Sequence, residues 1–226
     1  FYNISDSSIL DLDYVKNHSI NLFLKNNINV KWITFVPREK YNNSIYLYYL
    51  VCHLKKKMRV AIHQPEHLPW FGFIHKIAKA DKFVFLDNVQ FKKNYFENRN
   101  KIVTKQGVLW LTVPVKMKGH TSKKFNEILI DRSTDWKNKY IKTLKQTYGK
   151  SPYFNDIIPI IKLISNDQSS LLANLNINII IKLCELLSID TEFVFASKIC
   201  PSGNKSKLLI DILQKVNASE YLMGIS

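Results

Sequence analysis

The sequence predicts an α/β protein with a Rossmann-like, three-layer parallel sheet, and two observations carry this prediction. Residues 59–62 and 83–86 are short apolar runs of strand length, and polar side chains follow each of them. Between the runs, after a loop with two prolines, Phe73, Ile77 and Ala80 recur at helical spacing. The order strand, loop, helix, strand describes one βαβ unit, which joins two parallel strands through a right-handed crossover.

The polar residues that follow these two strands form the predicted site. In an open parallel sheet, ligands bind in the crevice beyond the carboxyl ends of the strands. An imidazole, a carboxylate, amides and cations at that edge suit an anionic small molecule, such as a phosphate or a nucleotide sugar. Plain loop composition explains the same residues at this point. The candidate site residues are His63, Gln64, Trp70, Asp87, Gln90, Lys93, Asn98 and Arg99.

The side-chain chemistry suggests a role for several of these residues. His63 is the candidate general base, because an imidazole titrates near neutral pH, and Asp87 would orient it or a substrate hydroxyl. Arg99, assisted by Lys93, would clamp a phosphate, and Trp70 would form the wall of a ring-binding pocket. Each role has a structural alternative: a buried hydrogen bond for the imidazole, a turn cap for the carboxylate, surface charge for the cations and core packing for the indole.

Charge and cysteine content limit the partners. The 226 residues carry a formal net charge of +15, which fits a small phosphorylated substrate or a coding bias toward lysine. A nucleic acid is the less favoured partner, since no nucleic-acid-binding motif occurs. The three cysteines have no metal-ligand spacing and predict reduced thiols in a cytoplasmic protein. No run approaches the roughly 18 apolar residues that span a bilayer. The sequence names no cofactor, no metal and no oligomeric state.

Residues 1–57 and 58–226 are expected to form separate parts. Residues 10–25 have helical spacing, and the β-type runs 30–36 and 45–52 predict a hairpin. A helix followed by an antiparallel hairpin resembles the carboxyl end of a class I methyltransferase domain, although no motif for a methyl donor is present. A small extension that packs on the main domain is the alternative.

After the βαβ unit, the pattern of residues 58–226 predicts further strands, a helix-rich portion and, near the end, strands that rejoin the sheet. The expected strands cover residues 108–115, 127–130 and 191–196 and a short strand at Tyr221, and the expected helices cover residues 136–148, 157–164, 171–187 and 208–216.

Several motifs of the second part resemble the WbqC-like family. They are HQPEHLPWFG from His63, DNVQF from Asp87, NRNKI from Asn98 and WLTVPV from Trp110, with Trp136, Tyr148 and Tyr221 further along. The resemblance covers residues 58–226 and implies a carboxyl end that continues beyond Ser226. It also implies a role in O-antigen or surface-polysaccharide biosynthesis, as a transferase that decorates an activated sugar with a glycyl or acyl group. The chain departs from the family at His67, where a tyrosine is usual.

Two further interpretations follow. The order of strand, loop, helix and strand along the chain is also similar to that of nucleotidylyltransferases such as pantothenate synthetases. Their signature histidines are missing, so only the fold is inferred by analogy. The alternative to a transferase is a noncatalytic module that binds a nucleotide or RNA, or that acts as a scaffold for neighbouring enzymes.

Overall fold

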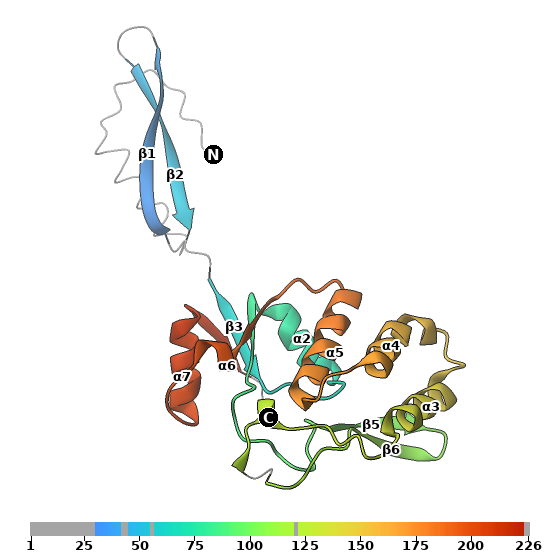
Figure 1. Cartoon of the computed structure of the whole chain (residues 1–226). Helices are drawn as coiled ribbons and strands as arrows, with labels where there is room; N and C mark the ends of the chain where they lie inside the picture. Colours follow the sequence, from blue (N-terminus) through green and yellow to red (C-terminus); the bar gives the residue numbers. More distant parts are fainter. Residues whose placement is uncertain (1–29, 42–44, 55–56, 120–121, 224–226) are drawn as a thin grey trace. The chain divides into compact units, whose positions relative to one another are not determined.

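The computed structural model describes residues 30–41, 45–54, 57–119 and 122–223, and the chain divides into two compact units, Phe1–Lys57 and Met58–Ser226. In the first unit, β1 (Val30–Tyr41) and β2 (Ile45–Leu54) pair as an antiparallel hairpin (Figure 1). The predicted hairpin is therefore confirmed. The helix predicted over residues 10–25 lies outside the described residues, and the resemblance to a methyltransferase stays a prediction.

The second unit is built on a four-stranded parallel sheet with the order β7-β4-β3-β8. Its strands are β3 (Arg59–His63), β4 (Lys82–Phe85), β7 (Glu192–Phe195) and β8 (Glu220–Leu222), and every neighbouring pair is parallel. The sequence-predicted α/β class with a Rossmann-like sheet is confirmed.

Helices cover both faces of this sheet, so the unit has three layers (Figure 1). On one face, α2 (Phe71–Lys79) and α5 (Leu172–Leu186) bury Phe73, Ile77 and their neighbours against Phe83 and Phe85. On the other face, α6 (Ala196–Ile199) and α7 (Ser206–Lys215) enclose a smaller cluster. The alternation along β3 explains the division, because neighbouring side chains of a strand point to opposite faces.

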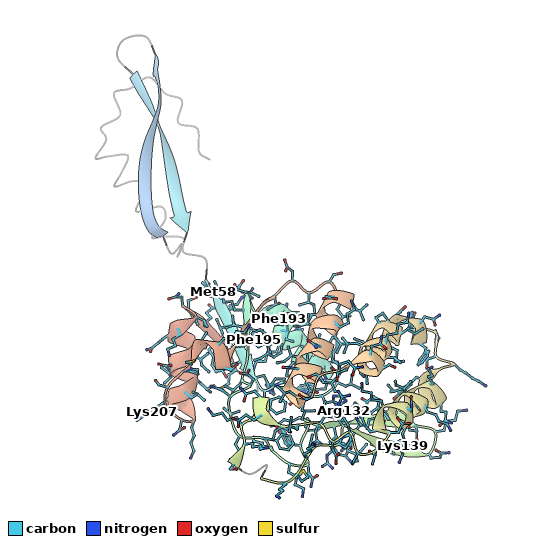
Figure 2. All side chains as sticks on the ribbon, viewed as in Figure 1. Met58, Arg132, Lys139, Phe193, Phe195 and Lys207 are labelled. Carbon is cyan, nitrogen blue, oxygen red and sulfur yellow. The ribbon has the colours of Figure 1, made fainter. Side chains whose placement is uncertain are left out.

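Aromatic rings fill the centre of the larger core. The Phe85 ring lies 5.3 Å from that of Phe193 and 5.7 Å from that of Phe195, which connects β4 to β7. Figure 2 labels Phe193 and Phe195. Stacked and tilted ring pairs of this kind stabilise a core beyond the area that they bury. These contacts fix β4, which ends at the predicted site, against β7.

A helical layer and a second hairpin complete the unit. The helices are α3 (Trp136–Tyr148), η3 (Phe154–Ile157) and α4 (Ile158–Asn166), and the hairpin consists of β5 (Arg99–Thr104) and β6 (Gly107–Thr112). Within the described part of the chain, every helix is too short or too polar to cross a bilayer.

The strand predicted over residues 127–130 is wrong. This stretch contains the end of η2 (Phe125–Glu127) and then makes only single bridges, Val115 to Ile130 and Leu129 to Leu171. Ile128 and Ile130 are buried in the core, and this burial explains the apolar pattern without a paired strand. The expected strand from residue 108 ends at Thr112, ahead of Pro114, which cannot donate to a ladder.

Candidate functional site

The parallel sheet brings His63 and Asp87 to one edge. His63 is the last residue of β3 and is paired with Phe85, the last residue of β4. Asp87 follows two residues later, so both side chains belong to the carboxyl edge that the sequence predicted. This is the position where ligands bind in open α/β sheets.

His63 is held as a neutral imidazole. Its Nδ1 lies 3.0 Å from the carbonyl oxygen of Gln64, which can only accept, so Nδ1 carries the proton and Nε2 remains the basic nitrogen. The ring also makes an edge contact with Phe73 at 4.9 Å. Burial lowers the pKa of His63; the Gln64 carbonyl opposes this shift, while the charges of Lys76 and Lys92 add to it. A neutral imidazole with a basic Nε2 suits proton abstraction.

Asp87 is used differently. One carboxylate oxygen accepts the backbone N–H of Ser197 at 2.8 Å, and the other accepts the Ser197 hydroxyl at 2.6 Å. This ties the end of β4 to the start of α6. Among the hydrogen bonds of the described residues, none joins Asp87 to His63, so the geometry favours the capping role over orientation of the imidazole.

Asn98 and Arg99 are anchored by one group and leave another unused. The Asn98 amide nitrogen donates to the Val113 carbonyl at 3.1 Å, whereas its Oδ1 is buried without a partner. Arg99 donates through Nη2 to the Asn94 carbonyl at 2.5 Å and stacks over Trp110, with 4.2 Å from Cζ to the ring centroid. Its Nε is also buried without a partner.

Trp70 is not a core residue. Its side chain is 66% exposed, and its carbonyl accepts the N–H of Phe73 at the start of α2. The indole ring lies over Gly72, where an added Cβ would be 2.1 Å from ring atoms, so the glycine makes room for it. The core-packing alternative for Trp70 is therefore wrong, and the ring remains accessible to a ligand.

The other three predicted residues lie at the surface or partly so. Gln64 is half-buried, and Gln90 and Lys93 are exposed. Gln90 forms a single antiparallel bridge with Lys124. The structure thus groups most of the predicted residues on the loops after β3 and β4, but in different states of exposure.

Sequence reasoning missed a buried polar network centred on His67. The His67 side chain is fully buried, with Nδ1 at 3.0 Å from Asn176 Oδ1 and Nε2 at 2.8 Å from the Tyr140 hydroxyl. Because Asn176 donates through Nδ2 to the carbonyls of Pro65 and Glu97, its Oδ1 must accept, so Nδ1 of His67 carries the proton. Burial lowers the pKa of His67 to about 4, opposed by the bond to Asn176.

The network shows what the side chain of His67 does in this chain. Both ring nitrogens of His67 are occupied by protein groups, and the Tyr140 hydroxyl must donate to Nε2. Burial raises the pKa of Tyr140, which keeps that proton in place. In this chain the residue therefore belongs to the interior scaffold of the loop and does not face a ligand.

Glu66 and Glu97 are buried carboxyl groups that sequence reasoning also missed. The carbonyls of Pro65 and Glu97 accept from the same Asn176 nitrogen, at 2.9 Å and 2.6 Å, so the two segments lie side by side. Glu97 Oε2 accepts the Lys92 N–H at 2.8 Å, but Glu97 Oε1 and Glu66 Oε2 have no partner. The neighbours of each glutamate in the sequence give no sign of this burial.

Burial shifts both carboxyl groups toward neutral pH. It raises the pKa of Glu66 to about 7. It also raises the pKa of Glu97 to about 7, with the Lys92 N–H and charge acting against it and the charge of Glu66 adding to it. Groups with pKa values near the working pH are effective acids and bases.

Unpartnered buried polar atoms gather in the predicted motifs. Buried polar groups are normally hydrogen-bonded, so exceptions point to a missing ligand or water. In the described part of the chain, five of the six such atoms come from residues 66–99, and four from Glu66 and residues 97–99. The full set is Glu66 Oε2, Asn88 Oδ1, Glu97 Oε1, Asn98 Oδ1, Arg99 Nε and Asn126 Oδ1.

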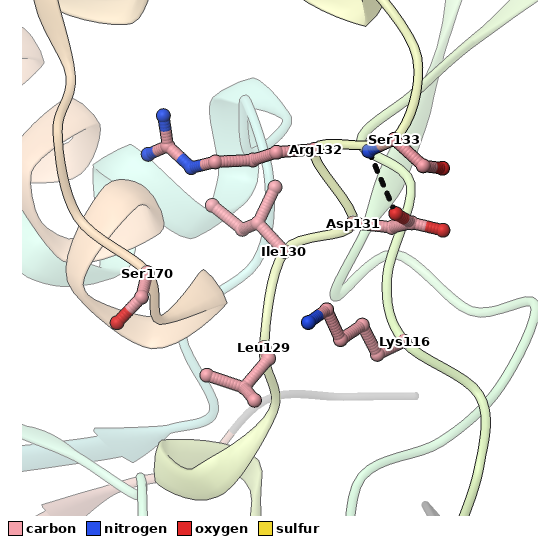
Figure 3. A pocket seen from close by; sticks show the side chains of 7 residues that line it. All are labelled: Lys116, Leu129, Ile130, Asp131, Arg132, Ser133 and Ser170. Atoms are coloured by element: carbon pink, nitrogen blue, oxygen red, sulfur yellow. Dashed lines mark hydrogen bonds between the residues drawn. The ribbon is translucent and has the colours of Figure 1, made fainter.

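Two surface hollows lie elsewhere. One, of about 330 Å³, is lined by Lys116, Asp131, Arg132 and neighbours (Figure 3). Two of its charged groups already have partners: Arg132 donates to the Ser169 carbonyl, and Asp131 accepts the Ser133 N–H at 2.9 Å. The other, of about 490 Å³, runs along α3. Neither hollow is lined by a described residue with an unsatisfied buried polar atom. No cluster of three metal-ligating side chains occurs among the described residues.

The fold defines a class: an α/β protein with a Rossmann-like parallel sheet and polar loops at the carboxyl edge of that sheet. The chain belongs to the WbqC-like protein family, whose model matches residues 64–226. It is also similar to the uncharacterized protein Rv1507c of Mycobacterium tuberculosis, at 33% identity over 169 residues, which is 74% of this chain and 73% of that protein. No solved structure matches the chain.

Proposed function

We propose that this chain binds a nucleotide-linked sugar at the carboxyl edge of β3 and β4 and transfers a glycyl or acyl group to it, as a step in O-antigen or surface-polysaccharide assembly. The observation that supports this most is the gathering of unpartnered, buried polar atoms in the motif loops. Family membership supports the setting.

The site offers a base for such a transfer. A hydroxyl or amine of the sugar would lose its proton to Nε2 of His63 as its oxygen or nitrogen attacks the activated carbonyl carbon of the donor. The bond between that carbon and the leaving group then breaks, and the leaving group takes up a proton. Glu66 and Glu97 have pKa values near 7 and would supply or store that proton.

Cations of the predicted site would hold the diphosphate. Arg99 has an unused Nε and a guanidinium oriented by Asn94 and Trp110. Lys93 is exposed, six residues before Arg99 in the sequence. An oriented guanidinium binds phosphate oxygens with better geometry than a flexible ammonium, so Arg99 should contribute more than Lys93. The exposed ring of Trp70 would cover a sugar or base.

A thermal-shift screen against nucleotide sugars tests this function. A bound ligand stabilises the folded state by mass action, so a true ligand raises the melting temperature in a concentration-dependent way. The shift should disappear in Arg99→Ala and in His63→Ala, and persist in the control Lys207→Ala, which removes an exposed cation from α7. A shift that survives both site substitutions would reject the site.

A noncatalytic nucleotide-binding module is the second candidate. It is favoured by Asp87, whose two oxygens bind Ser197 and leave His63 without a carboxylate partner in the described structure. Such a module would bind the ligand but not turn it over. Incubation of the protein with the ligand and an activated acyl donor, followed by mass spectrometry of the sugar, separates the two. An acylated product that requires His63 excludes the module.

A further inference from the structure

The positive charge of the second unit is concentrated in one stretch. Residues 88–126 contain nine lysines and arginines and a single acidic residue, Glu97. Glu97 is fully buried, so it does not offset these charges at the surface. The β5–β6 hairpin lies in the middle of this stretch. A surface with so uneven a balance attracts anionic partners.

One face of the hairpin combines these cations with exposed apolar side chains. In the antiparallel register, Lys101 is opposite Trp110 and Val103 is opposite Val108. Because side chains alternate along a strand, these four residues share a face. Val103 is 69% exposed, Val108 64% and Trp110 38%. On the opposite face, Leu109 is also exposed near the hairpin end.

The hairpin is held firmly from its other side. The Tyr148 hydroxyl, at the end of α3, lies 3.1 Å from the N–H of Val103, which donates to it, and donates to the Val103 carbonyl at 3.0 Å. Asn100 donates to the Leu68 carbonyl at 2.6 Å, and Leu111 is buried. Figure 1 shows β5 and β6 beside α3 at the margin of the unit. The scaffold therefore presents the apolar pair outward in a fixed position.

We infer that the outer face of the β5–β6 hairpin docks on an anionic lipid membrane, with Val103, Val108 and Trp110 at the acyl boundary and Lys101 and Lys105 at the headgroups. Aliphatic pairs enter the interface, indoles favour its polar margin, and lysines bind anionic lipids. This adds a place of action to the proposed chemistry and shares only Trp110 with the residues of the proposed site.

The geometry disfavours a nucleic acid on the same face. Single strands are bound by aromatic rings with open faces, on which bases stack. Here the Arg99 guanidinium lies 4.2 Å and the Lys101 ammonium 5.0 Å from the centroid of the Trp110 ring. An exposed valine pair directly opposite in the ladder offers nothing to a phosphate or a base edge, whereas burial of aliphatic surface in lipid is favourable.

Vesicle flotation with the full chain tests the inference. The probes are vesicles of phosphatidylcholine alone and of equal parts phosphatidylcholine and phosphatidylglycerol. We expect the protein to float with the anionic vesicles only and to be released at high salt, because lysine attraction to the surface is screened. Equal binding to both vesicle types, or to neither, would overturn the inference.

Two pairs of variants separate the contributions. Val103→Thr with Val108→Thr keeps β-branched side chains but removes apolar surface, and Lys101→Gln with Lys105→Gln removes charge. Each should weaken anionic vesicle binding by about tenfold. The charge control is Lys162→Gln with Lys207→Gln, at exposed positions on α4 and α7, and it should bind as wild type (Figure 2 labels Lys207).

Competition with RNA closes the test. A single-stranded RNA oligonucleotide is added to the floated vesicles, and binding to it is also measured directly by anisotropy. The inference expects the RNA to leave flotation with anionic vesicles unchanged. RNA that displaces the protein, with an affinity that falls in the Val103→Thr and Val108→Thr variant, would reassign the face to nucleic acid and overturn the proposal. Circular dichroism shows that each variant is folded.

Discussion

Two neighbouring residues of one loop, Glu66 and His67, are both buried yet lie in opposite circumstances. His67 has a partner at each ring nitrogen, and one of them, Asn176, is itself bonded to two backbone carbonyls. Glu66 has an oxygen with no partner, as do Glu97 and Asn98 across from it. A fully paired buried group specifies a structure, whereas an unpaired one costs stability and needs another reason to be present. The difference separates scaffold from site within a few residues.

The largest expected effect is on the paired side. His67→Ala would leave Asn176 Oδ1 and the Tyr140 hydroxyl without their partner and open a cavity, so we expect a loss of about 3 to 5 kcal/mol in the free energy of unfolding. Urea unfolding measures it. Tyr140→Phe, which removes one hydrogen bond but keeps the volume, should cost less, about 1 to 2 kcal/mol. Comparable costs for both would contradict the network.

The next prediction concerns Glu97, a buried group with an unpartnered oxygen, and here substitution is expected to stabilise the protein. Glu97 has a pKa of about 7 in the folded protein against an ordinary 4.5, so folding favours its protonated form. Ionisation therefore removes stability as pH rises from about 4.5 to 7, and the full penalty is present above that window. Glu97→Gln cannot ionise and keeps an acceptor for the Lys92 N–H.

Relative to wild type, Glu97→Gln should therefore gain about 2 to 3 kcal/mol between pH 5 and pH 8, measured by urea unfolding at both values. His67, with its pKa lowered to about 4, acts in the opposite direction, but it is common to both proteins and cancels in the difference. The exposed Glu185→Gln is the matched control and should show no such trend. If the difference in unfolding free energy between Glu97→Gln and wild type were the same at both pH values, the ionised form of Glu97 would be as stable in the folded protein as in the unfolded chain.

The comparison of paired and unpaired buried groups assigns Asp87 to the scaffold. Its two bonds to Ser197 place it with the paired scaffold, although its position at the strand end predicted a role in the site. Asp87→Asn should lower the free energy of unfolding by about 1 kcal/mol, as for a lost cap, and leave ligand affinity unchanged. Ser197→Ala should give a similar loss. A large fall in affinity with little change in stability would return Asp87 to the site.

How far the sequence could predict this molecule follows from the range of each signal. The βαβ unit was predictable because residues 59–62, 83–86 and the helix between them are local patterns, and the structure confirms them. The network of His67, Tyr140 and Asn176 was not predictable, because its members are 73 and 109 residues apart along the chain. Burial of Glu66 and Glu97 depends on the same long-range packing.

The residues of the predicted site divide along the same line. His63 lies at the strand end because strand periodicity places it there, and its parallel pairing with β4 follows from the crossover. The exposure of Trp70 contradicts the core-packing alternative, since apolarity alone predicts burial but the ring lies over Gly72 at the start of a helix. The partner of Asp87, Ser197, lies in α6 after β7, which no local pattern relates to β4.

The smallest effect is expected at Lys93, and it marks the boundary of the site. Lys93 is exposed, so Lys93→Ala should change the free energy of unfolding by less than about 0.5 kcal/mol. It should still weaken a nucleotide sugar found in the screen, by roughly threefold, because a flexible ammonium in solvent adds little to phosphate binding. Arg99→Ala should weaken the same ligand far more, since its guanidinium is oriented by Trp110 and Asn94. Titration of the ligand against both variants measures the two losses. Equal losses would show that the ligand is attracted by the overall positive charge of the loop. The orientation of the Arg99 guanidinium would then not matter for binding.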